Sequence, residues 1–173
     1  MARFSKGGGL PNAVIDNTLL TRLVKLEIAD FLPLLFKRIL IPPEVKREAY
    51  KAPEKGKRRL RKVINEMAGF FVDCRDADRL TLEFLKADLD EGEAAAIAQA
   101  DYTHSVLLLD EHKGYKRAEV MQLTTVRTTN LLIRLKDVGA IEAVKPYFDK
   151  LEKTGFHLKN EIRQRLLEEA GEV

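Results

Sequence analysis

Five short apolar segments, separated by stretches with apolar residues at helical spacing, constrain the fold of this chain most strongly. The pattern predicts strands at residues 12–16, 39–41, 70–74, 106–109 and 124–126. Between them it predicts helices over residues 18–26, 28–36, 42–50, 57–67, 76–86, 90–101 and 113–121, with a break at 53–56. Strands that alternate with helices favour a parallel sheet covered by helices on both faces. The sequence therefore predicts an α/β fold, in which ligands bind at the carboxyl ends of the strands.

The C-terminal part of the chain is predicted to be helical throughout. Helices are expected over residues 129–137, 141–153 and 159–169, with turns at Gly139 and Gly155. A length of 173 residues suits a single domain over 1–173, with a flexible tail at 1–11 and C-terminal helices at 141–173. These last helices carry more apolar residues than one sheet face needs, which predicts a homodimer. The residues concerned are Ile141, Val144, Tyr147, Phe148, Leu151 and Phe156.

Composition excludes several classes of protein. No apolar stretch approaches the roughly 18–20 residues that cross a bilayer, and the N-terminus lacks the hydrophobic core of a signal peptide, so a cytoplasmic location is expected. Cys74 is the only cysteine, which excludes an internal disulfide and a cysteine zinc site. His104, His112 and His157 are scattered and lack the spacing of a zinc site. Many Lys, Arg and Glu beside few Asn and Gln suggest a thermophilic source.

Positive charge is concentrated in one segment, although the net charge is only +3. Between Lys46 and Lys62 there are nine basic residues and two acidic ones, a local charge of +7. Such a block predicts a polyanionic partner, and its alternative interpretation is a solvated, charged helix. The side chains that would contact nucleic acid are Lys46, Arg47, Lys57, Arg58, Arg59, Arg61 and Lys62.

Acidic residues stand at or near the ends of the predicted strands. Asp16 ends the first strand, Asp110 ends the strand at 106–109, and Glu111 follows it. Glu48 lies in the helix after the second strand, and Glu93 lies in the first turn of the helix that begins near residue 90. If the strands are neighbours, these carboxylates converge at one edge of the sheet. Crowded carboxylates raise one another's pKa unless a cation lies among them, and Mg²⁺ or Mn²⁺ suits oxygen ligands.

Each acid also has a structural interpretation. Glu93 fits the third position of a capping box that Asp90 opens. Glu48 could pair with a neighbouring Lys or Arg, while Asp110 and Asp16 could each cap the helix that follows. Taken separately, these residues leave the two interpretations open.

Several motifs, taken together, resemble those of the PIN-domain nucleases, in particular the prokaryotic branch related to VapC-type toxins. They are V-I-D-N-T-L-L at 14–20, I-P-P-E-V-K-R-E at 41–48, D-E-G-E-A-A-A-I-A-Q-A at 90–100, L-L-L-D-E-H-K-G-Y-K-R-A at 107–118 and L-T-T-V-R-T-T-N-L-L at 123–132. The resemblance covers nearly the whole chain from Asn12 to Glu172. It implies a three-layer α/β/α PIN sandwich with a mostly parallel sheet of about five strands.

The resemblance also implies an activity and a set of residues. The expected activity is Mg²⁺- or Mn²⁺-dependent hydrolysis of RNA phosphodiesters, with Asp16, Glu48, Glu93 and Asp110 as the acid cluster. Glu111 would be a further metal ligand, and Thr18 and Thr128 would support the site. RNA, a second copy of the chain and an antitoxin-like inhibitor protein are the implied partners.

The chain departs from the family pattern at three places. Arg127 stands where Gly is usual, Tyr115 stands where Arg is frequent, and Glu111 replaces an Asp. These departures bear on efficiency and substrate preference more than on fold. A competing hypothesis is a nucleic-acid-binding or interaction module that keeps the PIN scaffold but has lost catalysis.

Overall fold

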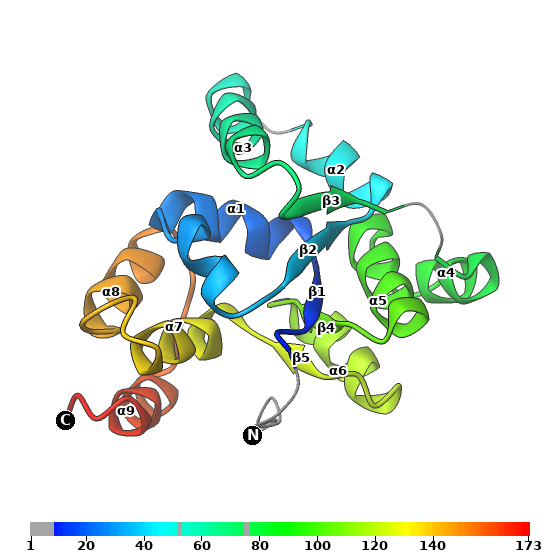
Figure 1. Ribbon diagram of the computed structural model, residues 1–173. Helices are drawn as coiled ribbons and strands as arrows, with labels where there is room; N and C mark the ends of the chain where they lie inside the picture. Colours follow the sequence, from blue (N-terminus) through cyan, green and yellow to red (C-terminus); the bar gives the residue numbers. More distant parts are fainter. Residues whose placement is uncertain (1–8, 52, 75–76) are drawn as a thin grey trace.

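Five parallel strands form the centre of the protein. The computed structural model describes residues 9–51, 53–74 and 77–173 of the chain. Within them, one sheet has the strand order β3-β2-β1-β4-β5 (Figure 1). Its strands are β1 (Asn12–Ile15), β2 (Arg38–Ile41), β3 (Phe71–Asp73), β4 (Val106–Leu108) and β5 (Thr125–Val126). Every pairing is parallel, which confirms the predicted α/β fold.

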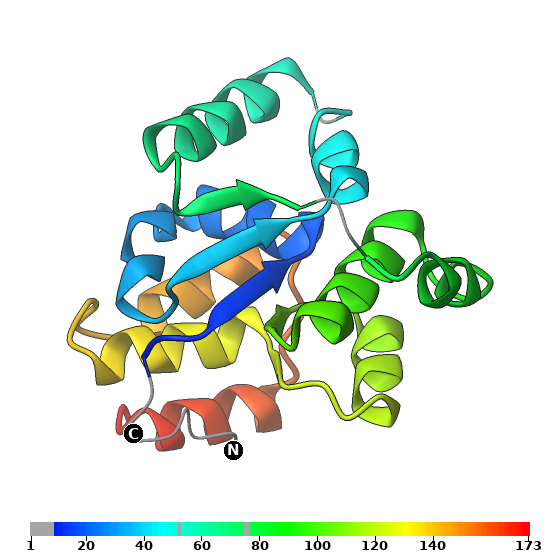
Figure 2. The same cartoon turned by 45° about the vertical axis from the view of Figure 1, so that its right-hand side comes forward.

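Helices cover both faces of this sheet (Figures 1 and 2). One side carries α1 (Asn17–Leu26), the 3₁₀ helix η1 (Ala29–Leu34), α3 (Glu54–Glu66), α7 (Thr128–Asp137), α8 (Lys145–Lys153) and α9 (Asn160–Glu169). The other side carries α4 (Arg79–Lys86), α5 (Glu91–Thr103) and α6 (His112–Val120). Helix α2 (Pro43–Ala49) contacts both α1 and α5 and lies where β2 ends. The result is the predicted three-layer arrangement.

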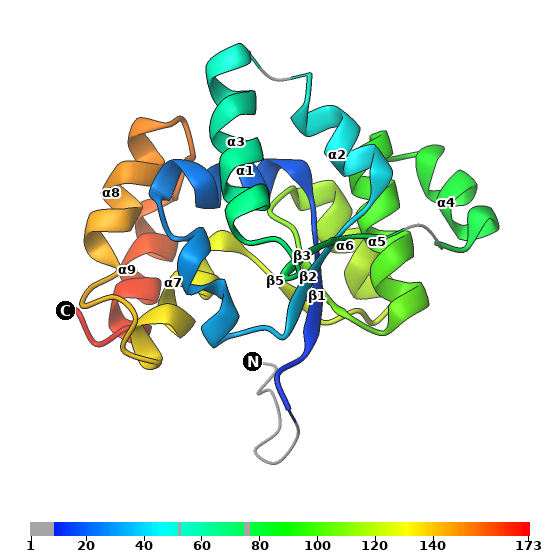
Figure 3. The ribbon, with the colours of Figure 1, turned by 45° about the horizontal axis from the view of Figure 1, so that its top comes forward.

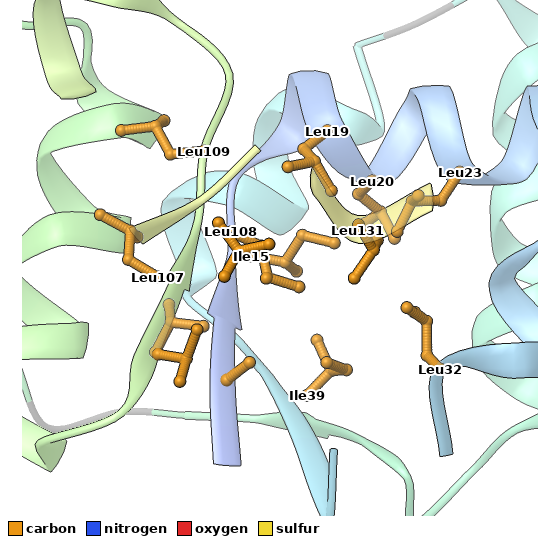
Figure 4. Close-up of a cluster of buried hydrophobic side chains, with 14 of the residues drawn as sticks. Ile15, Leu19, Leu20, Leu23, Leu32, Ile39, Leu107, Leu108, Leu109 and Leu131 are labelled. Atoms are coloured by element: carbon orange, nitrogen blue, oxygen red, sulfur yellow. The ribbon is translucent and has the colours of Figure 1, made fainter. Parts of the chain in front are cut away.

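The hydrophobic core lies between the central strands and α1. The three apolar residues of β1 and the leucines of β4 are fully or nearly fully buried, and α1 adds Leu19, Leu20 and Leu23 from one face (Figure 4). Helix α5 is buried along most of its length because alanines let it lie close to the sheet and to its neighbouring helices. The central strands are therefore fixed firmly, and so are the residues that directly follow them.

Three helix predictions need correction. Residues 28–36 form only the 3₁₀ helix η1, which contains Pro33, a residue without the N–H that an α-helix would need. The break predicted at 53–56 exists but lies earlier, between the end of α2 at Ala49 and the start of α3 at Glu54, because Pro53 is the N-cap of α3 and Gly56 lies inside that helix. Residues 141–144 are not helical, and α8 begins next to Pro146, which suits a first helical turn. The start of the helix predicted at 76–86 and most of the predicted tail at 1–11 lie outside the described residues.

The apolar residues of the C-terminal segment are used inside the chain. Ile141, Val144, Phe148 and Leu151 are buried in the core, so they leave no surplus apolar face of the kind that suggested a homodimer. The homodimer stays a prediction, without that support. Among the described residues, no helix combines the length and apolar character needed to cross a membrane.

Candidate metal and nucleic-acid site

Asp16 occupies the centre of the carboxyl edge of the sheet. Strand β1 pairs with β4 so that Ile15 is opposite Leu108, and the backbone N–H of Asp16 donates to the carbonyl of Leu108 at 3.1 Å. The Asp16 carboxylate then caps α1, because it accepts the backbone N–H groups of Leu19 at 2.9 Å and Thr18 at 3.2 Å. The predicted cap is thus real. Thr18 supports Asp16 through its backbone, whereas its side chain is exposed.

The charge of Asp16 is unfavourable in this position. The residue is only 2% exposed, and burial is the main cause that raises its pKa from the ordinary 3.8 to about 7. The nearby charges of Asp110 and Glu93 raise the pKa further, while the two capping N–H groups oppose the rise. The structure therefore brings Asp16, Asp110 and Glu93 into electrostatic contact, as the sequence predicted for neighbouring strands.

Asp110 is held by a cation and by the start of α7. Its side chain is 3% exposed, and Oδ2 lies 2.5 Å from Nη1 of Arg22 on α1. Oδ1 accepts the backbone N–H of Thr128 at 2.8 Å, and Oδ2 accepts the hydroxyl of Thr128 at 2.5 Å. Thr128 is fully buried and contacts Asp110 directly, while its supporting role in the site stays a prediction. The alternative interpretation was that Asp110 caps the next helix in the chain, which is α6. Asp110 instead accepts the N–H of Thr128 at the start of α7.

Arg22 is a site residue that the sequence did not reveal. Its guanidinium lies over the ring of Phe156 at 4.6 Å from the ring centre, which adds a cation–π contact to the ion pair with Asp110. Nothing in the sequence distinguishes Arg22 from other basic residues on helices. Only the packing of α1 against the end of β4 shows that this side chain neutralises one acid of the cluster.

Glu93 is the least compensated acid of the site. It is 6% exposed, and its Oε1 atom has no hydrogen-bond partner among the described residues. Burial, followed by the charges of Asp90 and Glu111, raises its pKa to about 7. Asp90 does cap α5 by accepting the backbone N–H of Glu93 at 2.8 Å, so the capping prediction holds for Asp90. The carboxylate of Glu93 remains available for another partner.

Two glycines make room for these acids. A Cβ atom on Gly114 of α6 would lie 3.4 Å from Oε1 of Glu93 and 2.9 Å from Cδ2 of Leu109. A Cβ atom on Gly92 would lie 2.8 Å from Oε1 of Glu48 and closer still to Oε2. At both positions any side chain would force the carboxylate or its surroundings to move. Such glycines are visible in the sequence, but their purpose depends on how three helices approach one another.

Glu48 reaches the site from α2. Its Oε1 accepts the backbone N–H of Gly92 at 2.8 Å, which places the carboxylate at the N-terminus of α5. Burial is the main cause that raises its pKa, and the Gly92 hydrogen bond opposes it. The predicted pairing of Glu48 with a neighbouring Lys or Arg is replaced by this backbone contact. Glu111 lies further out, is exposed, and caps α6 through the N–H of His112 at 3.2 Å.

The acids gather without forming a closed ligand set. Within the described ranges, no three Asp, Glu, His or Cys side chains are already grouped closely enough to hold a metal ion. The chemistry nevertheless suits a hard divalent cation, because Mg²⁺ keeps several waters and uses only one or two protein carboxylates. The unpartnered oxygen of Glu93 and the raised pKa values of Asp16 and Glu93 are the features that such an ion would relieve.

The basic block is more neutralised than its sequence implies. On α2, Lys46 pairs with Asp73 and Arg47 pairs with Glu91. On α3, three cations pair with acids: Arg58 with Glu54, Arg59 with Glu27 and Lys62 with Glu66. A fourth cation, Arg61, lies over the ring of Tyr50. Side chains of these pairs are mostly exposed, so each pair is weak and can be exchanged for a phosphate. The block is a solvated helix surface with charge still accessible to a polyanion.

A parallel five-stranded sheet with acids after its central strands defines an α/β protein of the PIN type. A family model described as a PIN domain matches residues 12–172, and the chain belongs to this family. PIN domains are generally nucleases that use divalent metal ions. The resemblance to PIN domains that the sequence motifs indicated is thereby confirmed.

Two solved structures are similar to this chain. PAE2754 from Pyrobaculum aerophilum has 15% sequence identity and a TM-score of 0.54, over 73% of this chain and 96% of that protein. VapBC2 from Rickettsia felis, solved bound to a DNA fragment from their promoter, has 13% identity and a TM-score of 0.49, over 67% and 98% respectively. The likeness to PAE2754 supports the fold. No curated protein sequence matches the chain.

Proposed function

We propose that this PIN domain is a metal-dependent endoribonuclease that acts at Asp16, Glu48, Glu93 and Asp110. The observation that carries the proposal is buried negative charge without enough compensation. Asp16 and Glu93 are both nearly inaccessible with pKa values raised to about 7, and within the described residues Asp110 is the one of the four acids that forms an ion pair, with Arg22. Burying acids in this way is unfavourable unless a cation occupies the site.

The oxygen ligands favour Mg²⁺ or Mn²⁺. Asp16, Glu93 and Asp110 would hold the ion, with Glu48 and Glu111 acting from further out. When bound, the ion would supply an activated water and stabilise charge on the phosphodiester oxygens.

The chain itself orients these acids before any ligand arrives. Thr128 fixes both oxygens of Asp110, and the backbone of Gly92 fixes Glu48. The first turn of α1 fixes Asp16. Each contact is a hydrogen bond of 2.5 to 3.2 Å to a buried or partly buried carboxylate, so the acids are positioned in advance and little reorganisation is needed.

RNA is the proposed substrate because accessible cations lie next to the acids. Lys46 and Arg47 are on the same helix as Glu48, and α3 continues the charge away from the site. The proposed contacts are Lys46, Arg47, Lys57, Arg58, Arg59, Arg61 and Lys62. As a toxin-like nuclease, the chain would be held inactive by an antitoxin-like inhibitor protein and would act as a homodimer; both belong to the proposal.

Cleavage of a single-stranded RNA tests the proposed activity. Wild-type protein should cut the RNA with Mg²⁺ or Mn²⁺ and stop when EDTA is added. Asp16→Asn should abolish cleavage while the protein remains folded. Glu48→Gln should reduce cleavage, whereas Glu44→Gln, one turn away on α2, is the matched control and should not. Equal activity of Asp16→Asn and wild type would refute the assignment of the site.

One observation favours the alternative, a nucleic-acid-binding module without catalysis. The ion pair between Arg22 and Asp110 already satisfies an acid that catalysis would need for the metal. On this alternative, RNA binding would be unaffected by EDTA and no cleavage would occur with either metal. The same cleavage assay, run beside an RNA-binding measurement, separates the two functions.

A further inference from the structure

A second cationic surface lies on the side of the acid site opposite to α2. Helices α1 and α8 pack side by side (Figures 1 and 3), and a pocket of about 250 Å³ opens between them. Four of its lining residues are cationic, and they are Arg22, Lys25, Lys150 and Lys153. Leu26 and Leu151 form its apolar floor. No motif in the sequence marks this surface, because its charges come from two segments 125 residues apart.

The charges of this pocket are arranged by helical spacing. Arg22 and Lys25 are three residues apart on α1, and Lys150 and Lys153 are three residues apart on α8. Residues three apart lie on the same face of a helix, so both pairs face the same pocket. Lys150 is also placed over the ring of Tyr147 at 5.4 Å. Two helices thus present cations to one shared space.

The acidic residues on α8 and at the end of α1 form ion pairs outside the pocket. Asp149 and Glu152 both pair with Arg163, and Glu27 pairs with Arg59. Among the described residues, no acidic side chain forms an ion pair with Lys25, Lys150 or Lys153. These exposed lysines are therefore uncompensated by ion pairs within the described residues, whereas three of the six cations of α3 are ion-paired. Such a surface is suited to an external anion.

Arg22 connects this pocket to the acid site. Its side chain is part of the pocket lining, and its guanidinium lies 2.5 Å from Oδ2 of Asp110. A chain of phosphates that places one phosphodiester at the acids can therefore place a flanking phosphate between α1 and α8. A free anion occupies a single place, whereas a nucleic-acid backbone carries successive phosphates that can occupy the acid site and the pocket at the same time.

We infer that the pocket between α1 and α8 binds a backbone phosphate of single-stranded RNA beside the bond to be cut. Lys25, Lys150 and Lys153 supply the positive charge that binds the phosphate. Arg22 lies between this phosphate and the acids, because it lines the pocket and pairs with Asp110. This inference rests on the proposed function for its substrate. It assigns the strongest RNA contact to this pocket and not to the segment from Lys46 to Lys62, in which five of the nine cations already have an acidic partner that a phosphate would have to replace.

The test is RNA binding by a triple variant, Lys25→Ala with Lys150→Ala and Lys153→Ala, measured by fluorescence anisotropy in EDTA from 50 to 200 mM salt. For single strands each phosphate contact contributes about −0.7 to the slope of log K against log salt, so three contacts contribute about −2. Wild-type affinity should therefore fall about 20-fold more than that of the variant across this range. The matched control removes three lysines elsewhere, Lys37, Lys86 and Lys159, and should keep the wild-type slope.

The outcomes separate this inference from the proposed function. Unchanged affinity and slope in the triple variant would overturn the pocket, even if wild-type protein cuts RNA with Mg²⁺. A flattened slope together with no cleavage by wild type would support the pocket and refute the nuclease. Displacement of RNA by millimolar inorganic phosphate alone would indicate a free-anion site and overturn the inference. Loss of poly-glutamate binding with normal RNA binding would point to an acidic protein and would overturn it too.

Discussion

Replacing Asp16 with Asn should stabilise the metal-free protein, by an amount that depends on pH. Burial and neighbouring acids raise the pKa of Asp16 from 3.8 to about 7. Each pKa unit corresponds to about 1.4 kcal/mol, so ionised Asp16 makes the folded, metal-free chain less stable by about 4 kcal/mol. Asn keeps one capping oxygen but loses the second, which accepts the backbone N–H of Thr18, and this lost hydrogen bond offsets roughly 1 kcal/mol of the gain. The expected net gain at pH 8 is about 3 kcal/mol.

The sign of the pH dependence follows from the direction of the pKa change. Because the folded pKa is higher than the unfolded one, the folded state holds an extra proton between about pH 4 and 7. The contribution of Asp16 to stability is therefore fully present below about pH 4 and is lost as pH rises through about 7. Asp16→Asn should match wild type or be slightly less stable at pH 4 and should be clearly more stable at pH 8.

Urea unfolding followed by circular dichroism, in EDTA at pH 4 and pH 8, measures this difference. In a chain of this length a gain of about 3 kcal/mol raises the melting temperature by roughly 6–12 °C. Asp78→Asn is the control, since Asp78 also caps a helix but is exposed, and hydrogen bonds to Thr81 lower its pKa. That control should lose stability at pH 8. A gain for Asp16→Asn that is equal at both pH values, or absent, would refute the reasoning from buried charge.

Three other predictions concern metal, RNA and assembly. Gly92→Ala should fold normally, since Ala favours a helix by about 1 kcal/mol over Gly, but its Cβ would displace Glu48. We expect its Mg²⁺ requirement for half-maximal cleavage to rise at least about tenfold, and an unchanged requirement would remove Glu48 from the site. The triple change of Arg58, Arg59 and Arg61 to Ala should weaken RNA binding irrespective of sequence, flatten the salt slope and raise KM more than it lowers kcat, which steady-state cleavage and salt titration measure. Sedimentation at micromolar concentration should show a dimer, and a monomer throughout would contradict the predicted homodimer.

The strands and their acids could be predicted because their signals are local. Apolar runs such as 106–109 end on an acid, and the rule that ligands bind at the carboxyl edge places Asp16 and Asp110 together once β1 and β4 are neighbours. The pairing itself was not visible in the pattern. For Asp16 the structural interpretation is confirmed, because its carboxylate caps α1. The same carboxylate is poorly compensated, and its role as a metal ligand stays a prediction.

The features that escaped prediction depend on contacts between distant segments. Arg22 meets Asp110 across 88 residues, and Arg59 of α3 meets Glu27 across 32 residues. No local pattern shows whether a lysine or arginine will find an acid in the folded chain, so the block from Lys46 to Lys62 looked more available than it is. The sequence likewise did not show that Lys25 is without an ion pair among the residues that the structure describes, or that it lies beside the lysines of α8.

The four acids are compensated in three different ways, and the difference determines what a metal ion must do. Asp110 has a permanent cation in Arg22, and Glu48 has the backbone N–H of Gly92. Asp16 and Glu93, with pKa values near 7, are partly compensated by protons at neutral pH. A divalent ion that binds there has to displace those protons, so its affinity should rise with pH through about 7. An ion held partly by Asp110 would not have to displace Arg22, because the ion pair uses Oδ2 of Asp110 and the ion could be held through Oδ1, which accepts the Thr128 N–H. Arg22 can therefore remain on Asp110 and face the RNA backbone, which makes the ion pair compatible with catalysis.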